Sequence, residues 1–130
     1  LSSNPNIVNI GSVHAVNTSS NIAAYSSSKA ALVGLTRNMA IELSKFNIRV
    51  NSISPGAIDT KMLRGGLLRG HVGNGNEDSL INALECKHLL GKIGTPDNIA
   101  NLVYYVTNNN FLTGSNLIID GGASIKLSTE

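Results

Sequence analysis

The stretch Ile48-Arg49-Val50-Asn51-Ser52-Ile53-Ser54-Pro55-Gly56 decides the fold of this chain of 130 residues. Its first six residues predict a strand. The dipeptide Pro55-Gly56 can continue neither a sheet ladder nor a helix, so we expect the strand to end there in a turn. The segments on either side of this strand decide what covers it.

A long helix and another strand are predicted upstream. Apolar residues recur at steps of three and four between Ala23 and Phe46, which is the period of a helix with one buried face. The β-branched run Ile7-Val8-Asn9-Ile10 predicts a short buried strand that ends in a loop at Gly11-Ser12. The helix positions predicted to be buried are Leu32, Leu35, Met39, Leu43 and Phe46.

Two helices and a last strand are predicted downstream. Residues 57–78 are rich in glycine, which suggests a mobile excursion that leads into a helix from Ser79 to His88. Thr95-Pro96-Asp97 supplies an N-cap, a proline at the first helical position and an early acid, so we expect a helix that stops in Asn108-Asn109-Asn110. Leu117-Ile118-Ile119 predicts the final strand.

This order of elements, β-α-β-α-β, places the chain in the α/β class. Unbroken apolar strands joined by helical crossovers indicate a parallel sheet covered on both faces. We therefore expect part of a Rossmann-like, doubly wound parallel sheet. The first strand would lie at an open edge, so its partner strands are expected outside these residues.

Composition excludes several classes of protein. Ten Lys and Arg against eight Asp and Glu give a net charge of +2, and the scattered basic residues form no stripe for nucleic acid. No apolar run approaches the roughly 20 residues that span a bilayer, and no secretory signal begins the sequence. Cys86 is the only cysteine, which excludes an internal disulfide and a multi-thiolate metal site. We expect a cytoplasmic protein with no metal and no nucleic-acid or membrane partner.

Tyr25 and Lys29 form the most chemically suggestive pair. They lie four residues apart at the start of the long helix, so their side chains share one face. A phenol is a poor base at neutral pH, and a nearby ammonium stabilises its phenolate. A tyrosine tuned in this way can exchange a proton with an alcohol or carbonyl oxygen. The alternative is a solvated helix face.

Ser12 and Pro55-Gly56 both follow predicted strands. Loops at the carboxyl ends of parallel strands line the ligand crevice of an open α/β sheet, so the Ser12 hydroxyl can bind a substrate oxygen there. Alternatively, Ser12 is a turn serine that bonds its own backbone. Strand polarity brings Pro55-Gly56 to the same crevice.

Several motifs occur in an order that one protein family shares. Asn9-Ile10-Gly11-Ser12-Val13 resembles a strand with a catalytic serine, and Tyr25-Ser26-Ser27-Ser28-Lys29 matches a Tyr-x-x-x-Lys signature. The stretch from Arg49 to Gly56 resembles the strand and turn beneath a nicotinamide. Through these motifs the chain resembles the C-terminal half of a classical short-chain dehydrogenase/reductase. Further matches are Gly94-Thr95-Pro96, Thr113-Gly114 and Asp120-Gly121-Gly122.

The resemblance implies an NAD- or NADP-dependent oxidoreductase that acts on a secondary alcohol or ketone as its small-molecule substrate. Tyr25 would be the general acid or base and would also contact substrate and cofactor. Lys29 would favour ionisation of Tyr25 and bind the nicotinamide ribose, while Ser12 would hold and polarise the substrate oxygen.

The resemblance also assigns the turn after the second strand to the cofactor. Pro55 and Gly56 would lie beneath the nicotinamide, and the backbone near Ile58 and the hydroxyl of Thr60 would bind its carboxamide. The excursion from about residue 61 to 78 would be the substrate loop.

Some family features are missing from the sequence. It contains neither G-x-G-x-x-G nor Thr-Gly-x-x-x-Gly-x-Gly, which would bind the pyrophosphate, and no residue that selects NAD or NADP. Gly11 stands where many members have a second serine. We therefore expect residues 1–130 to be the catalytic half of one Rossmann-type dehydrogenase domain, inactive alone, with the dinucleotide-binding half outside this chain. The alternative is a truncated, non-catalytic remnant that acts as an interaction module or pseudoenzyme.

The remaining candidate residues are expected to take no part in the chemistry. His14 is expected to be a hydrogen-bonded or solvated loop residue, although it can reach substrate. His71 and His88 are expected at the surface, and Cys86 as a small buried apolar residue. Apolar residues on the outer side of the long helix, including Ala30, Ala31 and Val33, lead us to expect a homodimer or homotetramer.

Overall fold

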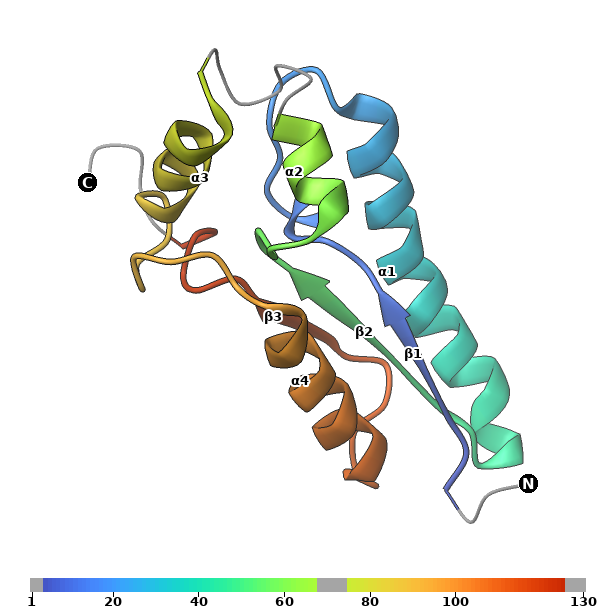
Figure 1. Ribbon diagram of the computed structural model, residues 1–130. Coiled ribbons are helices and arrows are strands. Elements are labelled where there is room, and N and C mark those ends of the chain that lie inside the picture. The colour runs from blue at the N-terminus through green and yellow to red at the C-terminus, as the bar shows by residue number, and fades with distance from the viewer. Residues whose placement is uncertain (1–3, 68–74, 126–130) are drawn as a thin grey trace.

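The computed structural model describes residues 4–67 and 75–125. They form a parallel sheet of three strands in the order β1-β2-β3 (Figure 1). The strands are β1 (Asn6–Ile10), β2 (Arg49–Pro55) and β3 (Asn116–Ile119). The three predicted strands, their parallel pairing and the edge position of β1 are confirmed. Pro55 is the last residue of β2, where it ends the ladder.

Two predicted helices are confirmed. The long helix is α1 (Ala23–Leu43), which a 3₁₀ turn, η2 (Ser44–Phe46), continues. The later helix is α4 (Pro96–Asn108). It begins at its predicted cap, because the side chain of Asn98 accepts a hydrogen bond from the Thr95 backbone N–H at 2.9 Å.

The segment after the turn is more helical than predicted. A short helix, α2 (Lys61–Leu67), occupies the start of the expected excursion. It forms there because Thr60 Oγ1 accepts the Leu63 N–H at 3.2 Å and so caps it. The next helix, α3 (Glu77–Glu85), begins and ends earlier than predicted because Asn76 caps it by accepting the Ser79 N–H. The rest of the expected excursion, residues 68–74, lies outside the described residues.

Helices cover both faces of the sheet, as expected. Asn9 donates to Thr36 of α1 at 2.9 Å, so Asn9 and its strand partner Ser52 face α1. Arg49 lies three residues before Ser52 and points to the opposite face, where it reaches Thr107 of α4. The strands step across the sheet in one direction while α1 and α4 cover opposite faces (Figure 1). The two crossovers therefore have opposite hands, and one departs from the right-handed rule.

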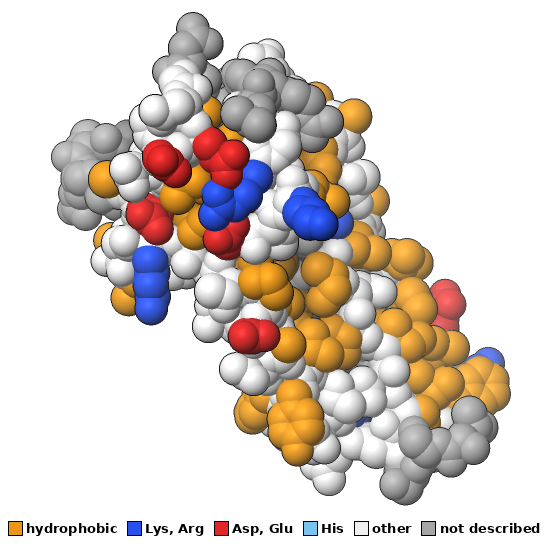
Figure 2. Space-filling model, viewed as in Figure 1, with side chains coloured by type: hydrophobic (Ala, Val, Ile, Leu, Met, Phe, Trp, Pro, Cys, Tyr) orange, Lys and Arg blue, Asp and Glu red, His pale blue; other side chains and the backbone are white. Residues whose placement is uncertain are grey.

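The buried face of α1 differs from the prediction. Thr36 and Ala40 are the buried residues of this helix, whereas the predicted core residues Leu35 and Phe46 are 51% and 61% exposed. Thr36 takes the position against the sheet because its hydroxyl accepts the hydrogen bond from Asn9. Leu32, Met39 and Leu43 are half-buried. Hydrophobic side chains consequently remain at the surface where α1 and β1 lie (Figure 2).

A buried arginine fastens the start of β2. Arg49 is only 9% exposed. Its guanidinium donates to the carbonyls of Val106, Thr107 and Leu112 at 2.8–3.1 Å, and its Nε donates to Asn4 Oδ1 at 3.1 Å. A cation is favourable at the C-terminal end of a helix, where carbonyls lack intrahelical partners. Arg49 thus ties α4 to the central strand.

Candidate active site

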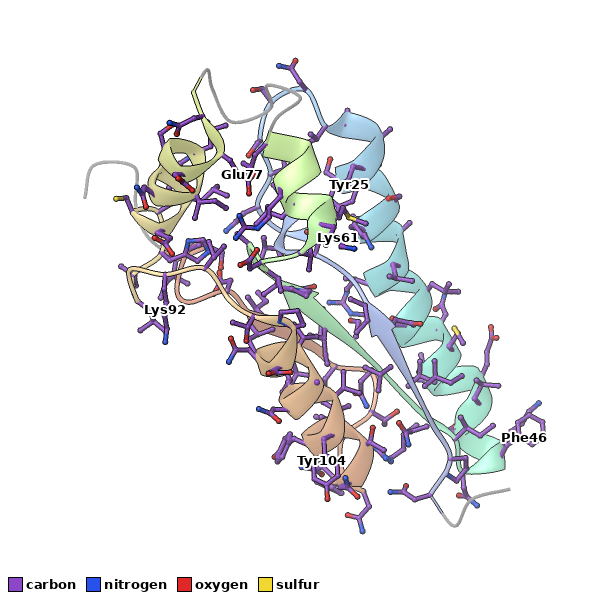
Figure 3. The ribbon with its side chains drawn as sticks, in the orientation of Figure 1. Tyr25, Phe46, Lys61, Glu77, Lys92 and Tyr104 are labelled. Carbon is purple, nitrogen blue, oxygen red and sulfur yellow. The ribbon has the colours of Figure 1, made fainter. Side chains whose placement is uncertain are left out.

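The carboxyl ends of β1 and β2 meet at one edge of the sheet. Ile10 pairs with Ile53, and the Gly11 N–H donates to the Ile53 carbonyl at 2.7 Å. Ser12 and Pro55-Gly56 therefore leave the sheet beside one another, as strand polarity predicted. The first turn of α1, which carries Tyr25, lies at the same end of the molecule (Figure 3).

Ser12 sits in a short capped turn. It is buried and precedes a 3₁₀ turn, η1 (Val13–Ala15), and its Oγ accepts the His14 N–H at 3.2 Å. This is the local bond of a turn serine, one of the two readings that the sequence left open. The two roles are compatible, because a hydroxyl that accepts a hydrogen bond still has its own proton to donate.

Tyr25 and Lys29 lie close together on α1. The Lys29 ammonium is 5.7 Å from the centre of the Tyr25 ring and donates to the Ile10 carbonyl at 3.1 Å. One turn of the helix brings the pair together, and the bond to Ile10 fixes the ammonium at the end of β1. Tyr25 itself is 44% exposed, so its phenol is accessible from outside the chain.

His14 belongs to this cluster, although the sequence predicted only a hydrogen-bonded or solvated loop residue. Its ring centre is 5.9 Å from that of Tyr25, with the planes at 72°, an edge-to-face arrangement. Its Nδ1 is enclosed and has no hydrogen-bond partner among the described residues. Burial lowers the pKa of His14 below its usual value, so the ring is neutral near pH 7. The available signal was its position two residues after Ser12, but spacing alone did not give the direction of the ring.

The residues predicted to lie beneath the nicotinamide and at its carboxamide are at the end of β2 and just after it. A Cβ on Gly56 would lie 2.8 Å from Asp120 Cβ, so only glycine fits between β2 and the end of β3. Ile58 forms an isolated parallel bridge with Gly94. Thr60 caps α2 as described above, and its hydroxyl proton stays available to an acceptor.

The donor groups at this edge fit a ribose and a carboxamide. The Lys29 ammonium has three N–H groups and gives one to Ile10, which leaves two for sugar hydroxyls. The Thr60 hydroxyl can donate to an amide carbonyl. The sequence contains neither G-x-G-x-x-G nor Thr-Gly-x-x-x-Gly-x-Gly, the patterns that bind a pyrophosphate.

Charged side chains gather over α2 and α3 (Figure 2). The Arg64 guanidinium of α2 pairs with Asp59 at 2.7 Å and also with Glu77 at the start of α3. The hydrogen bond from Arg64 holds the pKa of Asp59 below its usual range. The sequence analysis missed this cluster, because its members are separated by an intervening segment and no helical spacing joins all three.

Two expectations about isolated residues are wrong. His88 is buried rather than at the surface, because its Nδ1 bonds the Leu84 carbonyl at 2.7 Å and its ring packs against Gly121. Cys86 is exposed rather than buried, since it lies just past the end of α3. His71 lies outside the described residues.

Neither a cluster of potential metal ligands nor a membrane-spanning helix occurs among the described residues. Within residues 4–67 and 75–125, His, Cys, Asp and Glu side chains nowhere gather in the threes that could hold a metal ion. None of the described helices combines the length and the apolar character needed to cross a membrane.

A serine loop and a helix with a Tyr-Lys pair thus lie at the carboxyl edge of this parallel α/β sheet. A family model described as Enoyl-(Acyl carrier protein) reductase matches residues 1–124. The chain belongs to the short-chain dehydrogenase/reductase family, and it corresponds to the C-terminal portion of the family fold.

Individual relatives agree with this assignment. An uncharacterized oxidoreductase of Thermotoga maritima is 36% identical over 127 residues, which are 95% of this chain and 47% of that protein. A 4-hydroxyisoleucine dehydrogenase complexed with NADH is 37% identical, with a TM-score of 0.78 over 95% of this chain and 48% of that one. ElxO with NADP bound is 31% identical, with a TM-score of 0.76 over 93% of this chain and 47% of that one. The chain spans about half the length of the curated relatives it matches.

Proposed function

We propose that this chain is the catalytic half of an NAD(P)-dependent oxidoreductase that interconverts a secondary alcohol and a ketone. The observation that carries the proposal is the cluster of Ser12, Tyr25 and Lys29 at the carboxyl edge of a parallel sheet. Residues 1–130 would form part of one Rossmann-type domain, with the dinucleotide-binding half supplied by chain outside these residues. The proposed activity is that of the whole domain.

Tyr25 is the proposed general acid and base. When a ketone is reduced, its hydroxyl gives a proton to the carbonyl oxygen, and when an alcohol is oxidised, its phenolate takes that proton back. The nicotinamide, when bound, supplies or accepts the hydride at the carbon of the same C–O bond. The exposure of Tyr25, 44%, leaves its phenol within reach of a substrate.

Lys29 and Ser12 would prepare that proton transfer. The Lys29 ammonium lies 5.7 Å from the centre of the Tyr25 ring, and its two remaining N–H groups can bind the cofactor ribose. Ser12 would donate its hydroxyl proton to the substrate oxygen. The His14 N–H that Ser12 already accepts polarises this hydroxyl and strengthens it as a donor.

Pro55, Gly56, Ile58 and Thr60 would hold the nicotinamide ring. Pro55 ends β2 and the other three residues lie in the segment that follows it, where Thr60 has a hydroxyl proton to offer the carboxamide. The proposed cofactor is NAD or NADP, since one structure that matches this chain holds NADH and another holds NADP.

Substitution of Tyr25 in the full-length polypeptide tests this function. Tyr25→Phe removes the hydroxyl and should lower kcat for ketone reduction by on the order of 10²- to 10⁴-fold. Binding of NADH or NADPH, measured by fluorescence titration, should change by less than about threefold. The matched control is Tyr104→Phe, since Tyr104 is a 73% exposed tyrosine on α4. Turnover of Tyr25→Phe at the rate of this control would remove the acid–base assignment.

A non-catalytic interaction module is the second candidate. Two observations favour it. Among the described residues β1 has no partner strand on its outer side, and α1 exposes apolar residues, including Ile41 at 74% exposure. The intact mass of the native protein separates the two candidates. About twice the present length, with a glycine-rich turn after its first strand, supports the enzyme, whereas a native product of this size supports the module.

We also propose that the full-length protein is a homodimer or homotetramer that pairs through α1. Ala30 and Ala31 are exposed on this helix, and Leu35 is 51% exposed beside them. Small and apolar residues on one face allow two helices to pack closely. Light scattering of the full-length protein that shows only a monomer would remove this part of the proposal.

A further inference from the structure

His14 contacts both residues to which the chemistry is assigned. Its backbone N–H donates to Ser12 Oγ at 3.2 Å, and its ring meets the Tyr25 ring edge to face at 5.9 Å. No other residue of the described chain joins these two sites through a hydrogen bond and a ring contact. The position of His14 therefore affects the hydroxyl of Ser12 and the phenol of Tyr25 together.

Tyr25 needs support from outside its own helix. It is the third residue of α1, and Ile22 at the N-cap makes no side-chain hydrogen bond to that first turn. An uncapped first turn leaves backbone N–H groups unpaired and tends to fray. The phenol is also 44% exposed, so the core does not fix its rotamer. Among the described residues, Lys29 places its ammonium 5.7 Å from the centre of this ring and His14 meets it edge to face.

The enclosed nitrogen of His14 fixes the form of its ring. A proton on Nδ1 would be a buried donor with no acceptor among the described residues, so the proton of the neutral ring belongs on Nε2. A neutral ring adds no second cation beside the Tyr25–Lys29 pair. The ring consequently acts on Tyr25 through its shape and its edge-to-face contact.

We propose that His14 is a positioning residue that holds the Tyr25 phenol in the orientation for proton transfer by packing its neutral imidazole against the phenol ring. The proposal rests on the acid–base role of Tyr25 set out above. Small displacements of a reacting group lower turnover steeply, while ground-state binding of cofactor and substrate changes little.

Three substitutions in the full-length polypeptide test this role. His14→Ala removes the ring and should lower kcat by about 10- to 100-fold, with the KM for ketone and cofactor within about threefold of wild type. His14→Phe keeps an aromatic ring without nitrogens and should return kcat to within about threefold of wild type. His14→Leu fills the space without an aromatic edge and should resemble His14→Ala; it also replaces that variant if His14→Ala does not fold. Val16→Ala, at an exposed position next to the same turn, is the matched control.

The outcomes distinguish a failure of the positioning role of His14 from a failure of the acid–base function of Tyr25. Wild-type kcat in both His14→Ala and His14→Leu would overturn the positioning role. A kcat for His14→Phe as low as that of His14→Ala would also overturn it, because a ring nitrogen would then be the active group, as in a hydrogen bond to substrate. If Tyr25→Phe retains activity, the acid–base function itself fails, whatever the His14 variants do.

Discussion

The two ends of β2 are built in opposite ways. At its start, Arg49 is 9% exposed and donates four hydrogen bonds, three of them to carbonyls at or beyond the end of α4. At its end, beyond Pro55, the neighbouring side chains are incompletely paired: Tyr25 is 44% exposed and His14 Nδ1 has no partner within the described chain. The polar groups of Arg49 at one end of the strand are matched by partners, whereas Tyr25 and His14 near the other end are not fully paired within the described chain.

The contrast suggests that residues at the start of β2 stabilise the fold, whereas residues near its end serve the proposed chemistry. Buried polar groups with full hydrogen bonding make one arrangement of the chain much more favourable than its alternatives. Groups that must bind and release a ligand cannot have all their partners within the protein. We therefore expect substitutions at the start of β2 to affect unfolding, and those around Tyr25 to affect turnover.

The largest effect on stability is expected at Arg49. Arg49→Met keeps an unbranched stem but removes the guanidinium, which leaves carbonyls of Val106, Thr107 and Leu112 without their donor. The free energy of unfolding should fall by about 3 kcal/mol. Urea denaturation followed by circular dichroism measures this change.

Two further variants are compared with Arg49→Met. One replaces another arginine at an exposed position, and the other changes a residue near the opposite end of β2. Arg37→Met, at an exposed position of α1, should change the free energy of unfolding by less than about 0.5 kcal/mol. Tyr25→Phe should be equally neutral for unfolding. A loss for Tyr25→Phe as large as that for Arg49→Met would break the contrast between the two ends.

A smaller effect is expected at Gly56, which follows β2 and lies against Asp120 just after β3. The added Cβ of Gly56→Ala would lie 2.9 Å from Asp120 Cα, which is backbone and cannot rotate away. Overpacking of this kind costs about 2 kcal/mol of unfolding free energy. The matched control is Gly65→Ala in α2, which meets nothing within 4 Å and should be neutral or stabilising by up to about 1 kcal/mol. Equal stability of the two variants would mean that the strands can separate at Gly56 without loss.

The smallest effect is expected at Asp120 and depends on pH. Burial alone would raise its pKa, but hydrogen bonds from Ser124 and Gly122 and the neighbouring His88 outweigh it and hold the pKa of Asp120 below its usual value. A carboxyl with a lower pKa in the folded state stabilises the fold above its unfolded pKa of about 3.9. That contribution is lost as the pH falls through the folded pKa.

Asp120→Asn should accordingly lower the free energy of unfolding by about 1 kcal/mol at pH 7. The difference from wild type should shrink below about pH 4, where wild type itself takes up the proton. Denaturation curves between pH 2 and 7 measure it, with Glu42→Gln on exposed α1 as the control. A difference from wild type that is constant over this range would exclude the carboxylate as its source.

Some site residues could be placed from the sequence, for local reasons. The spacing of Tyr25 and Lys29 on a helix dictates that they meet, and the polarity of parallel strands dictates that Ser12 and Gly56 leave the sheet at one edge. The contact of His14 with Tyr25 could not be placed in this way. It depends on how the η1 turn packs against α1, which no spacing within either segment encodes.

The buried face of α1 could not be predicted from the sequence either. Hydrophobic periodicity pointed to Leu35 and Phe46, but the sheet is met by Thr36 and Ala40. The choice was made by Asn9, whose amide bonds the Thr36 hydroxyl, and by Gly114, which lies against Ala40. Both contacts join residues that are far apart in the sequence.

By itself, the sequence determined the strands, the two main helices, their parallel arrangement and the Tyr25–Lys29 pair, because each follows from residues within one or two helical turns or from strand direction. Only the tertiary structure decided that α4 lies on the face opposite α1, that Arg49 is buried against its last carbonyls, and that His14 touches Tyr25. These features depend on contacts between segments that are distant in the sequence. The free energy of desolvating polar groups selects the partners there, and no local sequence pattern encodes them.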